Sequence, residues 1–201
     1  SFTIKEVSGV PLIQKVKIGG KIQTDITKLF ENIVGNGTKL KSVSEVDSTT
    51  VGFKWVEAIL IDSDLKEEVY KVPVTVYDDK TTIFNEVDKI VLDANSIGFT
   101  VEEITEIIKG NSLSESILQK SEAEAWQAEN GEESIVTVLS HDVKPKIGSY
   151  TATIRATRTD TNKILEKKVA IYITDEPLKD GWEFGSSSDA ISSNGYKIEW
   201  E

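Results

Sequence analysis

The sequence contains no cysteine, a single histidine and no long run of apolar residues. Without cysteine the chain has no disulfide, no thiolate metal site and no cysteine nucleophile. One histidine and no cysteine also leave too few ligands for a zinc site. No stretch of about 20 apolar residues is present, so we expect no membrane span.

Motifs that carry common catalytic chemistry are also missing. No G-x-x-x-x-G-K-[ST] phosphate loop and no G-x-S-x-G nucleophile motif occur, and Gly19-Gly20 does not form a G-x-G-x-x-G. The histidine, His141, lies in "LSHDVKP" beside turn residues, which favours an exposed or capping role over a catalytic base. Adjacent acids such as "KEE" and "GEE" are expected on solvated faces rather than in a glycosidase pair. We therefore predict no catalytic residue and no enzyme activity.

Basic residues are fewer than acidic ones. The chain has 23 Lys and Arg against 34 Asp and Glu, a formal net charge of −11. Such a surface repels phosphate backbones and anionic lipid, so neither nucleic acid nor membrane is an expected partner. The charge also discourages self-association, so we expect a monomer. No basic stretch followed by an apolar core is visible, so we expect that a signal peptide was removed or that the chain is an excised fragment.

The clearest positive signal is "KIGSYTATIRATRTD" at 146–160. After Gly148, the residues Tyr150, Ala152, Ile154 and Ala156 occupy one side of a period-two pattern, which is typical of a half-buried strand. "RTDTNK" then reads as a turn, and "ILEKKVAIYITD" returns with alternating apolar residues. The segment is predicted to be an antiparallel hairpin that closes a domain.

A second copy of this layout lies upstream, in "TVGFKWVEAILIDSDLKEEVYKVPVTVYDD" at 50–79. The interval from Gly52 to Gly148 is 96 residues, and that from Asp78 to Asp175 is 97. A shared interval indicates two similar domains in series. We expect both glycines where the chain bends into a strand and a side chain would clash. Tyr150, and Phe53 or Trp55 in the first copy, should then cover the edge of the core.

The upstream halves agree in part, each with a short strand followed by a helical stretch. In "FTVEEITEIIKG", Thr100 can be the N-cap of a helix over 100–109, with Glu103 completing a capping box and Gly110 ending it. The helix of the first copy is expected to be shorter. "SEAEAWQAENGEE" at 121–133 is either a helical turn or a strand carrying Trp126, and Asn130-Gly131 marks a tight turn before the strand "SIVTVLS".

These patterns predict a mainly β chain with two domains. Domain 1 spans 1–79, a short and semi-rigid linker spans 80–87, and domain 2 spans 88–175. Residues 176–201 form either a tail hairpin or the start of a further unit.

Two sets of residues carry a resemblance. They are "DVKPKIGSYTATIRAT" with "KKVAIYITDEP", and "VDSTTVGFKWVEAILIDSD" with "VPVTVYDD". Both sets resemble the Ig-like tandem repeats of Gram-positive cell-wall-anchored surface proteins, including listerial and enterococcal adhesins and internalin-like proteins. "FTVEEITEII…SEAEAW" is similar to the helix-bearing insert of many such repeats. The resemblance covers roughly residues 15–175 and implies two tandem Ig-like β-sandwich domains, with a short helical insert at least in the second. No LPxTG-type sorting signal is present, so wall attachment is an inference about the parent chain.

Candidate site residues are few. Calcium is the only metal to weigh as a cofactor, and its candidate ligands are Asp62, Asp64, Asp78 and Asp79, with turn formation as the simpler role of these residues. A lysine isopeptide bond is a further alternative, because similar Gram-positive domains use one. It needs a lysine in a buried apolar site, and Lys21 or Lys89 are the candidates. Candidate ligand-binding aromatics are Trp182, Phe184, Tyr196 and Trp200, with core packing as the alternative.

The function we expect is that of a non-catalytic extracellular repeat module, located at the cell surface or wall of a Gram-positive bacterium. Such a module acts as a stalk or spacer and takes part in adhesion. The alternatives are an adhesive module that binds a host protein or glycan, and an accessory module of a secreted carbohydrate-active enzyme. Its partners would then be a host protein or glycan and the neighbouring repeats of the parent chain.

Overall fold

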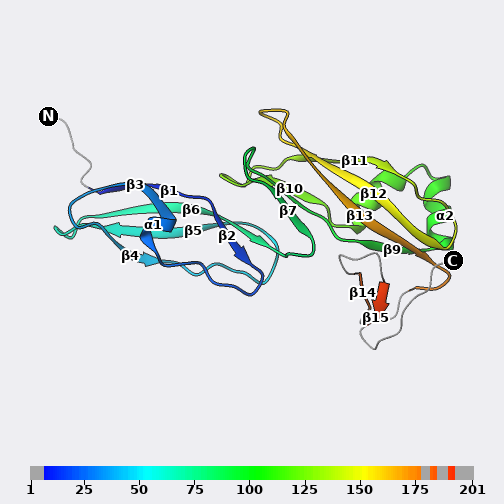
Figure 1. Ribbon diagram of the computed structural model, residues 1–201, viewed down its shortest axis with the longest axis horizontal. Helices are drawn as coiled ribbons and strands as arrows, with labels where there is room; N and C mark the ends of the chain where they lie inside the picture. Colours follow the sequence, from blue (N-terminus) through cyan, green and yellow to red (C-terminus); the bar gives the residue numbers. More distant parts are fainter. Residues whose placement is uncertain (1–6, 178–181, 185–189, 193–201) are drawn as a thin grey trace. The chain divides into compact units, whose positions relative to one another are not determined.

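The computed structural model describes residues 7–177, 182–184 and 190–192, and within them the chain is mainly β, in an arrangement consistent with a β-sandwich (Figure 1). It divides into two compact units. The first runs to Asp78 and includes Ala128–Glu132, and the second comprises Asp79–Gln127 and the residues from Glu133 onward. In the described residues no helix is long and apolar enough to cross a membrane.

The first unit contains six strands and one short helix. They are β1 (Ser8–Pro11), β2 (Gln14–Lys17), α1 (Ile26–Leu29), β3 (Phe30–Val34), β4 (Lys39–Val43), β5 (Gly52–Ile61) and β6 (Glu67–Tyr77). β1 pairs with β3, and a four-stranded sheet has the order β2-β6-β5-β4. β2 joins β6 in parallel, whereas the other pairs are antiparallel.

The β5–β6 hairpin follows from alternation along its strands. Val56, Ala58 and Leu60 are almost fully buried, while the residues between them lie on the opposite side of the sheet. Around these side chains the first unit forms two small clusters of buried apolar residues, one with Leu29, Phe30 and Val72 and one with Val16 and Val74.

Up to Thr174 the second unit has seven strands in two sheets and two helices. They are β7 (Thr82–Asn85), β8 (Ile90–Asp93), β9 (Ile97–Thr100), α2 (Val101–Lys109), α3 (Leu113–Lys120), β10 (Glu124–Gln127), β11 (Ile135–His141), β12 (Gly148–Thr157) and β13 (Ile164–Thr174). The sheets have the orders β10-β8-β7 and β11-β12-β13-β9, with β9 parallel to β13. A separate antiparallel pair joins β14 (Trp182–Phe184) to β15 (Ala190–Ser192).

The predicted hairpin and helix of the second unit are both confirmed. Ala152, Ile154 and Ala156 of β12 are fully buried, and β12 pairs with β13 along its whole length. Thr100 is the N-cap of α2, its side chain and that of Glu103 complete the capping box, and Gly110 is the C-cap.

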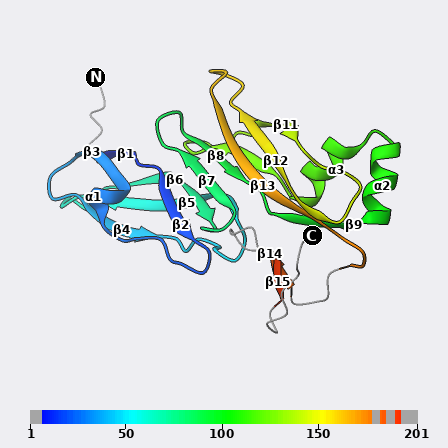
Figure 2. The ribbon, with the colours of Figure 1, turned by 45° about the vertical axis from the view of Figure 1, so that its right-hand side comes forward.

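The helices α2 and α3 lie together beside β9 at one end of the unit (Figure 2). Ile104 of α2 and Ile117 of α3 are fully buried in a large core with residues of both sheets. The sequence stretch that was ambiguous, 121–133, begins with the turn after α3 and continues as β10, which carries the buried Trp126.

The two units share one strand order. In each, an early strand pairs in parallel with the last strand of the four-stranded sheet, and a helical segment follows. The next strand then pairs with the strand that precedes the early one, which is β1 in the first unit and β8 in the second. Val16 lies opposite Val76 in the first unit, as Phe99 lies opposite Ile173 in the second. The extra length of the second unit upstream of its hairpin is taken up by α2 and α3.

The structure corrects the interpretation of the two glycines. A Cβ added at Gly52 would meet nothing within 4 Å, and what requires glycine there is a φ of +150°. Gly148 does not have a positive φ, and a Cβ there would approach the Tyr150 hydroxyl at 3.3 Å.

The structure also corrects the expected position of two aromatics. Tyr150 packs against the core as expected, and its hydroxyl donates to the carbonyl of Lys146 at 2.9 Å. Phe53 and Trp55 instead have the opposite parity to Val56 and lie on the outward side of β5.

Residues 80–87, expected to form a linker, contain β7. Its four residues pair with β8 in the sheet of the second unit, and Thr82 is buried. Thr81 and Thr82 both donate to the carboxylate of Asp93, at 2.6 and 2.8 Å. The segment was difficult to recognise as a strand because it is only four residues long and begins and ends with a polar residue.

Candidate functional site

The aspartates proposed for calcium have roles in turns and at the boundary of the units. Asp62 is buried, and its Oδ1 accepts from the backbone N–H groups of Asp64 and Lys66, both at 2.9 Å. This contact shapes the β5–β6 turn, a common role for aspartate. Asp78 and Asp79 are the last and first residues of the two units. Within the described residues, no group of three or more His, Asp or Glu side chains is placed to hold a metal ion.

The candidate residues for other chemistry are exposed or lie outside the described part. His141 ends β11 in an exposed position, and its Nδ1 accepts from the N–H of Val143 at 3.2 Å, which is a turn contact. Lys21 and Lys89 are exposed, so neither has the buried apolar site that an isopeptide bond needs.

The aromatic residues of the tail lie largely outside the part of the chain that the structure describes. Trp182 and Phe184 belong to β14, but their side chains, together with Tyr196 and Trp200, lie outside the described residues. Their proposed part in ligand binding stays a prediction.

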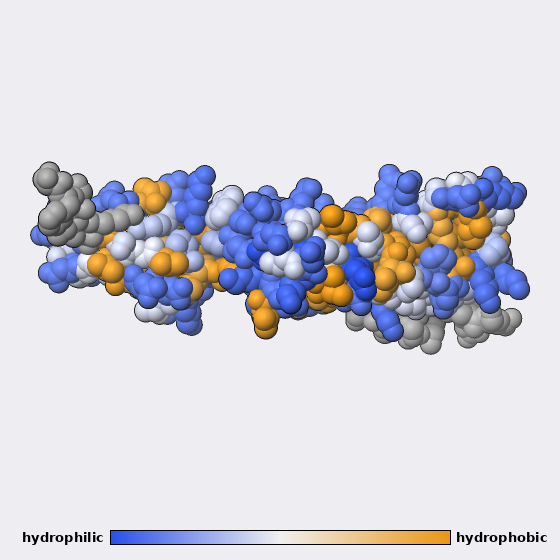
Figure 3. Space-filling model, turned by 90° about the horizontal axis from the view of Figure 1, so that it is seen from above, coloured by the Kyte–Doolittle hydropathy of each residue, from blue (hydrophilic) through white to orange (hydrophobic). Residues whose placement is uncertain are grey.

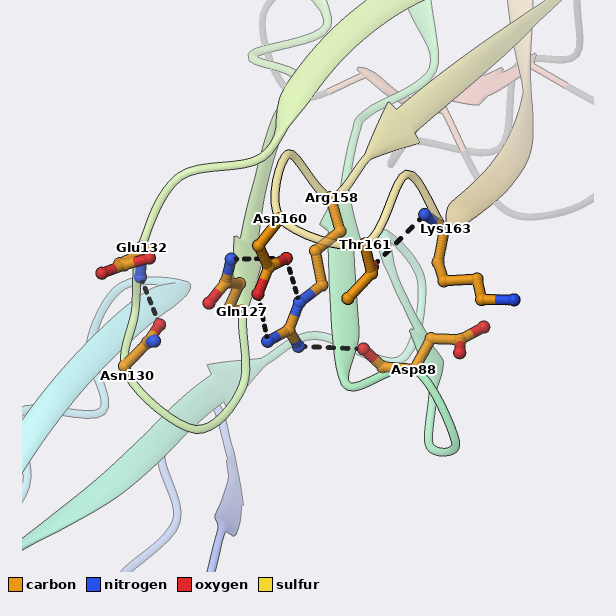
Figure 4. Close-up of polar contacts among 8 residues, drawn as sticks. All are labelled: Asp88, Gln127, Asn130, Glu132, Arg158, Asp160, Thr161 and Lys163. Carbon is orange, nitrogen blue, oxygen red and sulfur yellow. Dashed lines mark hydrogen bonds and ion pairs between the residues drawn. The ribbon is translucent and has the colours of Figure 1, made fainter.

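A polar cluster in the second unit centres on Arg158 (Figure 4). Its Nε and Nη2 donate to the two carboxylate oxygens of Asp160 at 2.8 and 3.1 Å, and Nη1 donates to the carbonyl of Asp88 at 3.0 Å. Gln127 donates weakly to Asp160 at 3.4 Å. These hydrogen bonds hold the pKa of Asp160 below its usual range, with the Arg158 side chain as the main cause.

The cluster connects three segments of the unit. The Arg158 side chain is only 11% exposed, and it joins the β12–β13 turn to the segment before β8. Asp160 joins the same turn to Gln127 at the end of β10. The turn is closed by the Arg158 N–H to the Lys163 carbonyl at 2.8 Å. These hydrogen bonds give the cluster the role of a structural clamp. The sequence indicated the turn but gave no sign of the contact with Asp88.

A second feature that sequence reasoning missed is an apolar surface on the first unit. We call it the Trp55 face, meaning the outward side of the sheet β2-β6-β5-β4. Its apolar residues are Phe53, Trp55, Ile59 and Val69. Its charged residues are an ion pair between Lys41 and Glu67, together with Lys15, Lys17, Lys39, Lys71 and Glu57. Trp55 is 49% exposed and Val69 is 54% exposed. Figure 3 shows one side of the molecule, where apolar side chains reach the surface among hydrophilic ones.

The Trp55 ring packs against a neighbouring aromatic ring. It meets Phe53 edge-on, with ring centroids 5.1 Å apart and planes at 90°, a favourable aromatic geometry. Across the ladder it lies opposite Pro73, which is buried despite its position on the outward side. A signal was available in the sequence, because the buried alternation of Val56, Ala58 and Leu60 places Trp55 outward.

A comparison with protein-family models found no match for this chain, and a comparison with curated proteins found none either. The geometry of the described residues therefore carries the functional argument.

Proposed function

We propose that this chain is a non-catalytic repeat segment of a bacterial surface protein, in which two Ig-like sandwiches in series act as a spacer that bears tension. The extracellular, Gram-positive setting rests on the resemblance of "GSYTATIRAT" and its upstream counterpart to wall-anchored repeats. The hydrogen bond from the Tyr150 hydroxyl to the upstream Lys146 carbonyl supports the Ig-like assignment, since Ig-type sandwiches use a tyrosine in this way.

The observation that carries the proposal is the parallel pairing of β2 with β6 and of β9 with β13. In each unit this joins a strand near its start to its last strand. A chain under tension pulls the start of β2 and the end of β6 in opposite directions along their common axis. The ladder is then sheared, so its hydrogen bonds are loaded together rather than opened one after another.

Additional contacts extend both parallel ladders. The N–H of Ile18 donates to the carbonyl of Tyr77 at 2.9 Å, beyond the end of β2. In the second unit the N–H of Ala170 donates to the Ser96 hydroxyl at 3.3 Å, before the start of β9. Each ladder therefore has one more bond to break than the strand pairing alone provides.

The test is single-molecule stretching of the chain between two marker domains. We expect two unfolding events, with contour lengths of about 25 nm for Ser8–Tyr77 and about 33 nm for Thr82–Thr174, before subtraction of the folded lengths. Ile18→Pro removes the donor to Tyr77 and should lower the unfolding force of the first unit only. Ile18→Ala keeps the N–H and is the matched control.

A second pulling geometry separates shear from general stability. Because the chain has no cysteine, thiols introduced at Thr50 and Asp79 are unique handles beside the N-terminal end of β5 and the C-terminal end of β6. Pulling there opens the antiparallel β5–β6 ladder bond by bond, and should need a clearly lower force. If the first unit unfolded at the same force in both pulling geometries, the proposal that it is a spacer under tension would be rejected.

A further inference from the structure

We propose that the Trp55 face is a binding site for an anionic glycan, a polymer whose sugar rings carry carboxylate or sulfate groups. The ring of Trp55 would stack on a sugar ring, and the lysines around it would pair with the acidic groups. This site is separate from the tail aromatics and is not required by the spacer function.

The first argument is that the fold does not need apolar residues at the positions of Trp55, Ile59 and Val69. The second unit has the same strand order, and its register identifies equivalent positions. Ile59 and Val69 face each other across β5 and β6, where the second unit has Arg155 and Glu166. That pair is an ion pair, with both Nε and Nη2 of Arg155 2.8 Å from Oε2 of Glu166.

The aromatic positions follow the same rule. Trp55 lies opposite Pro73, and its equivalent Thr151 lies opposite Ala170. Phe53 has Ser149 as its equivalent, but the Phe53 ring also has a packing role, because a Cβ added at Gly131 would lie only 2.2 Å from its Cδ1. The outward side of a sheet in this fold is therefore stable with polar residues, and an exposed apolar cluster on it needs another explanation.

The second argument is that Trp55 is ready to bind. The edge-on contact with Phe53 restricts the Trp55 ring on one side, and 49% of the residue stays exposed. A ring that is already restricted loses little conformational entropy when a ligand stacks on it.

The third argument is the charge of the face. The chain as a whole is acidic, with a net charge of −11, yet Lys39 and Lys71 are exposed on the same face as Trp55. Lys71 lies opposite Glu57 and diagonally adjacent to Trp55, within reach of a ligand that stacks on the ring. The local excess of lysine in an acidic chain is complementary to a negatively charged ligand and directs it to this face.

The experiment is calorimetric titration of the whole chain with three hexasaccharides. The probes are a hyaluronan hexasaccharide with carboxylates, a heparin-derived hexasaccharide with sulfates, and neutral cellohexaose. We expect at least one acidic probe to bind about tenfold or more tightly than cellohexaose, and to bind more weakly as salt is raised. Equal affinity for the neutral probe, or no binding of the acidic probes at millimolar concentration, would overturn the proposal.

Variants locate the site. Trp55→Ala and Lys71→Gln should each weaken binding of the acidic probe by roughly tenfold, whereas Trp55→Phe should retain most of it because an aromatic ring remains. Thr151→Ala, at the equivalent position of the second unit, should leave affinity unchanged. Urea unfolding of each variant shows that the first unit is folded.

Two other results would contradict the site. If Trp55→Ala binds the acidic probe as the unmodified chain does, the ligand lies elsewhere. If light scattering shows a dimer that Trp55→Ala converts to a monomer, the occupant of the face is a second copy of the chain rather than a glycan.

Discussion

Arg158 holds Asp160 with two nitrogens, Nε 2.8 Å from Oδ1 and Nη2 3.1 Å from Oδ2. The pairing is local in sequence, but the third guanidinium nitrogen reaches the carbonyl of Asp88. The turn between the last two strands of the second unit is thus fixed to the segment before β8.

This arrangement predicts a pH dependence of stability. The pKa of Asp160 is lowered below its ordinary value of 3.8, with the Arg158 side chain as the main cause. A carboxylate with a lowered pKa in the folded state stabilises it above the unfolded pKa, and this contribution is lost as pH falls through the folded pKa. Asp160→Asn should therefore reduce stability at pH 7 and make the urea midpoint fall less steeply below about pH 4.

The control for this experiment is Asp64→Asn, at an exposed aspartate in the β5–β6 turn of the first unit. It should leave the unfolding of the second unit unchanged throughout the pH range. If the difference between Asp160→Asn and the unmodified chain were the same at pH 2 as at pH 7, the ion pair would not be its source.

The glycines that begin β5 and β12 should respond differently to alanine. Gly52 has a φ of +150°, so Gly52→Ala should destabilise the first unit by about 1–3 kcal/mol. Gly148 does not have a positive φ, so Gly148→Ala should cost the second unit less, roughly 1 kcal/mol or under, by displacing Tyr150. Urea unfolding of each variant measures both values, and an equal cost at the two positions would contradict the role assigned to φ.

Lys167 should stabilise the second unit by joining its two sheets. Its Nζ donates to the carbonyl of Ala94 at 2.7 Å and also to that of Thr81, next to β8 and β7. Lys167→Met keeps the length of the side chain and removes the donor, which should cost about 1–3 kcal/mol. Lys168→Met, on the outward side of the same strand, is the matched control and should change stability by less than about 0.5 kcal/mol.

The cap of α2 gives a further prediction. Thr100 accepts from the N–H of Glu103 at 3.1 Å, and the Glu103 carboxylate accepts from the N–H of Thr100 at 3.1 Å. Thr100→Ala should destabilise the second unit by about 1 kcal/mol, whereas Thr100→Ser should restore most of the loss. Thermal unfolding followed by circular dichroism measures both, and failure of serine to restore stability would point to the buried methyl group instead.

Local patterns were sufficient for the elements whose residues act on near neighbours. The alternation of Ala152, Ile154 and Ala156 predicted β12, and Thr100 with Glu103 predicted the start of α2. The same parity argument, applied to Val56 and Ala58, would have placed Trp55 outward.

Features set by distant contacts could not be predicted in this way. The parallel partners of β2 and β9 lie far along the chain, and no local pattern specifies them. Strand β7 was missed because its threonines bond to the carboxylate of Asp93, which is a tertiary contact. The contact of Arg158 with the carbonyl of Asp88 depends in the same way on the folded arrangement.

The helical connection that follows β2 in the first unit and β9 in the second differs in length between the units, and this difference has a practical consequence. The first unit makes this connection through the four-residue α1, and the second through both α2 and α3, yet the strand order of the four-stranded sheet is the same. This position therefore accepts extra chain without disturbing the rest of the fold. In the first unit, the α1 connection is the natural place to insert a peptide tag, a fluorophore site or an additional small domain by protein engineering.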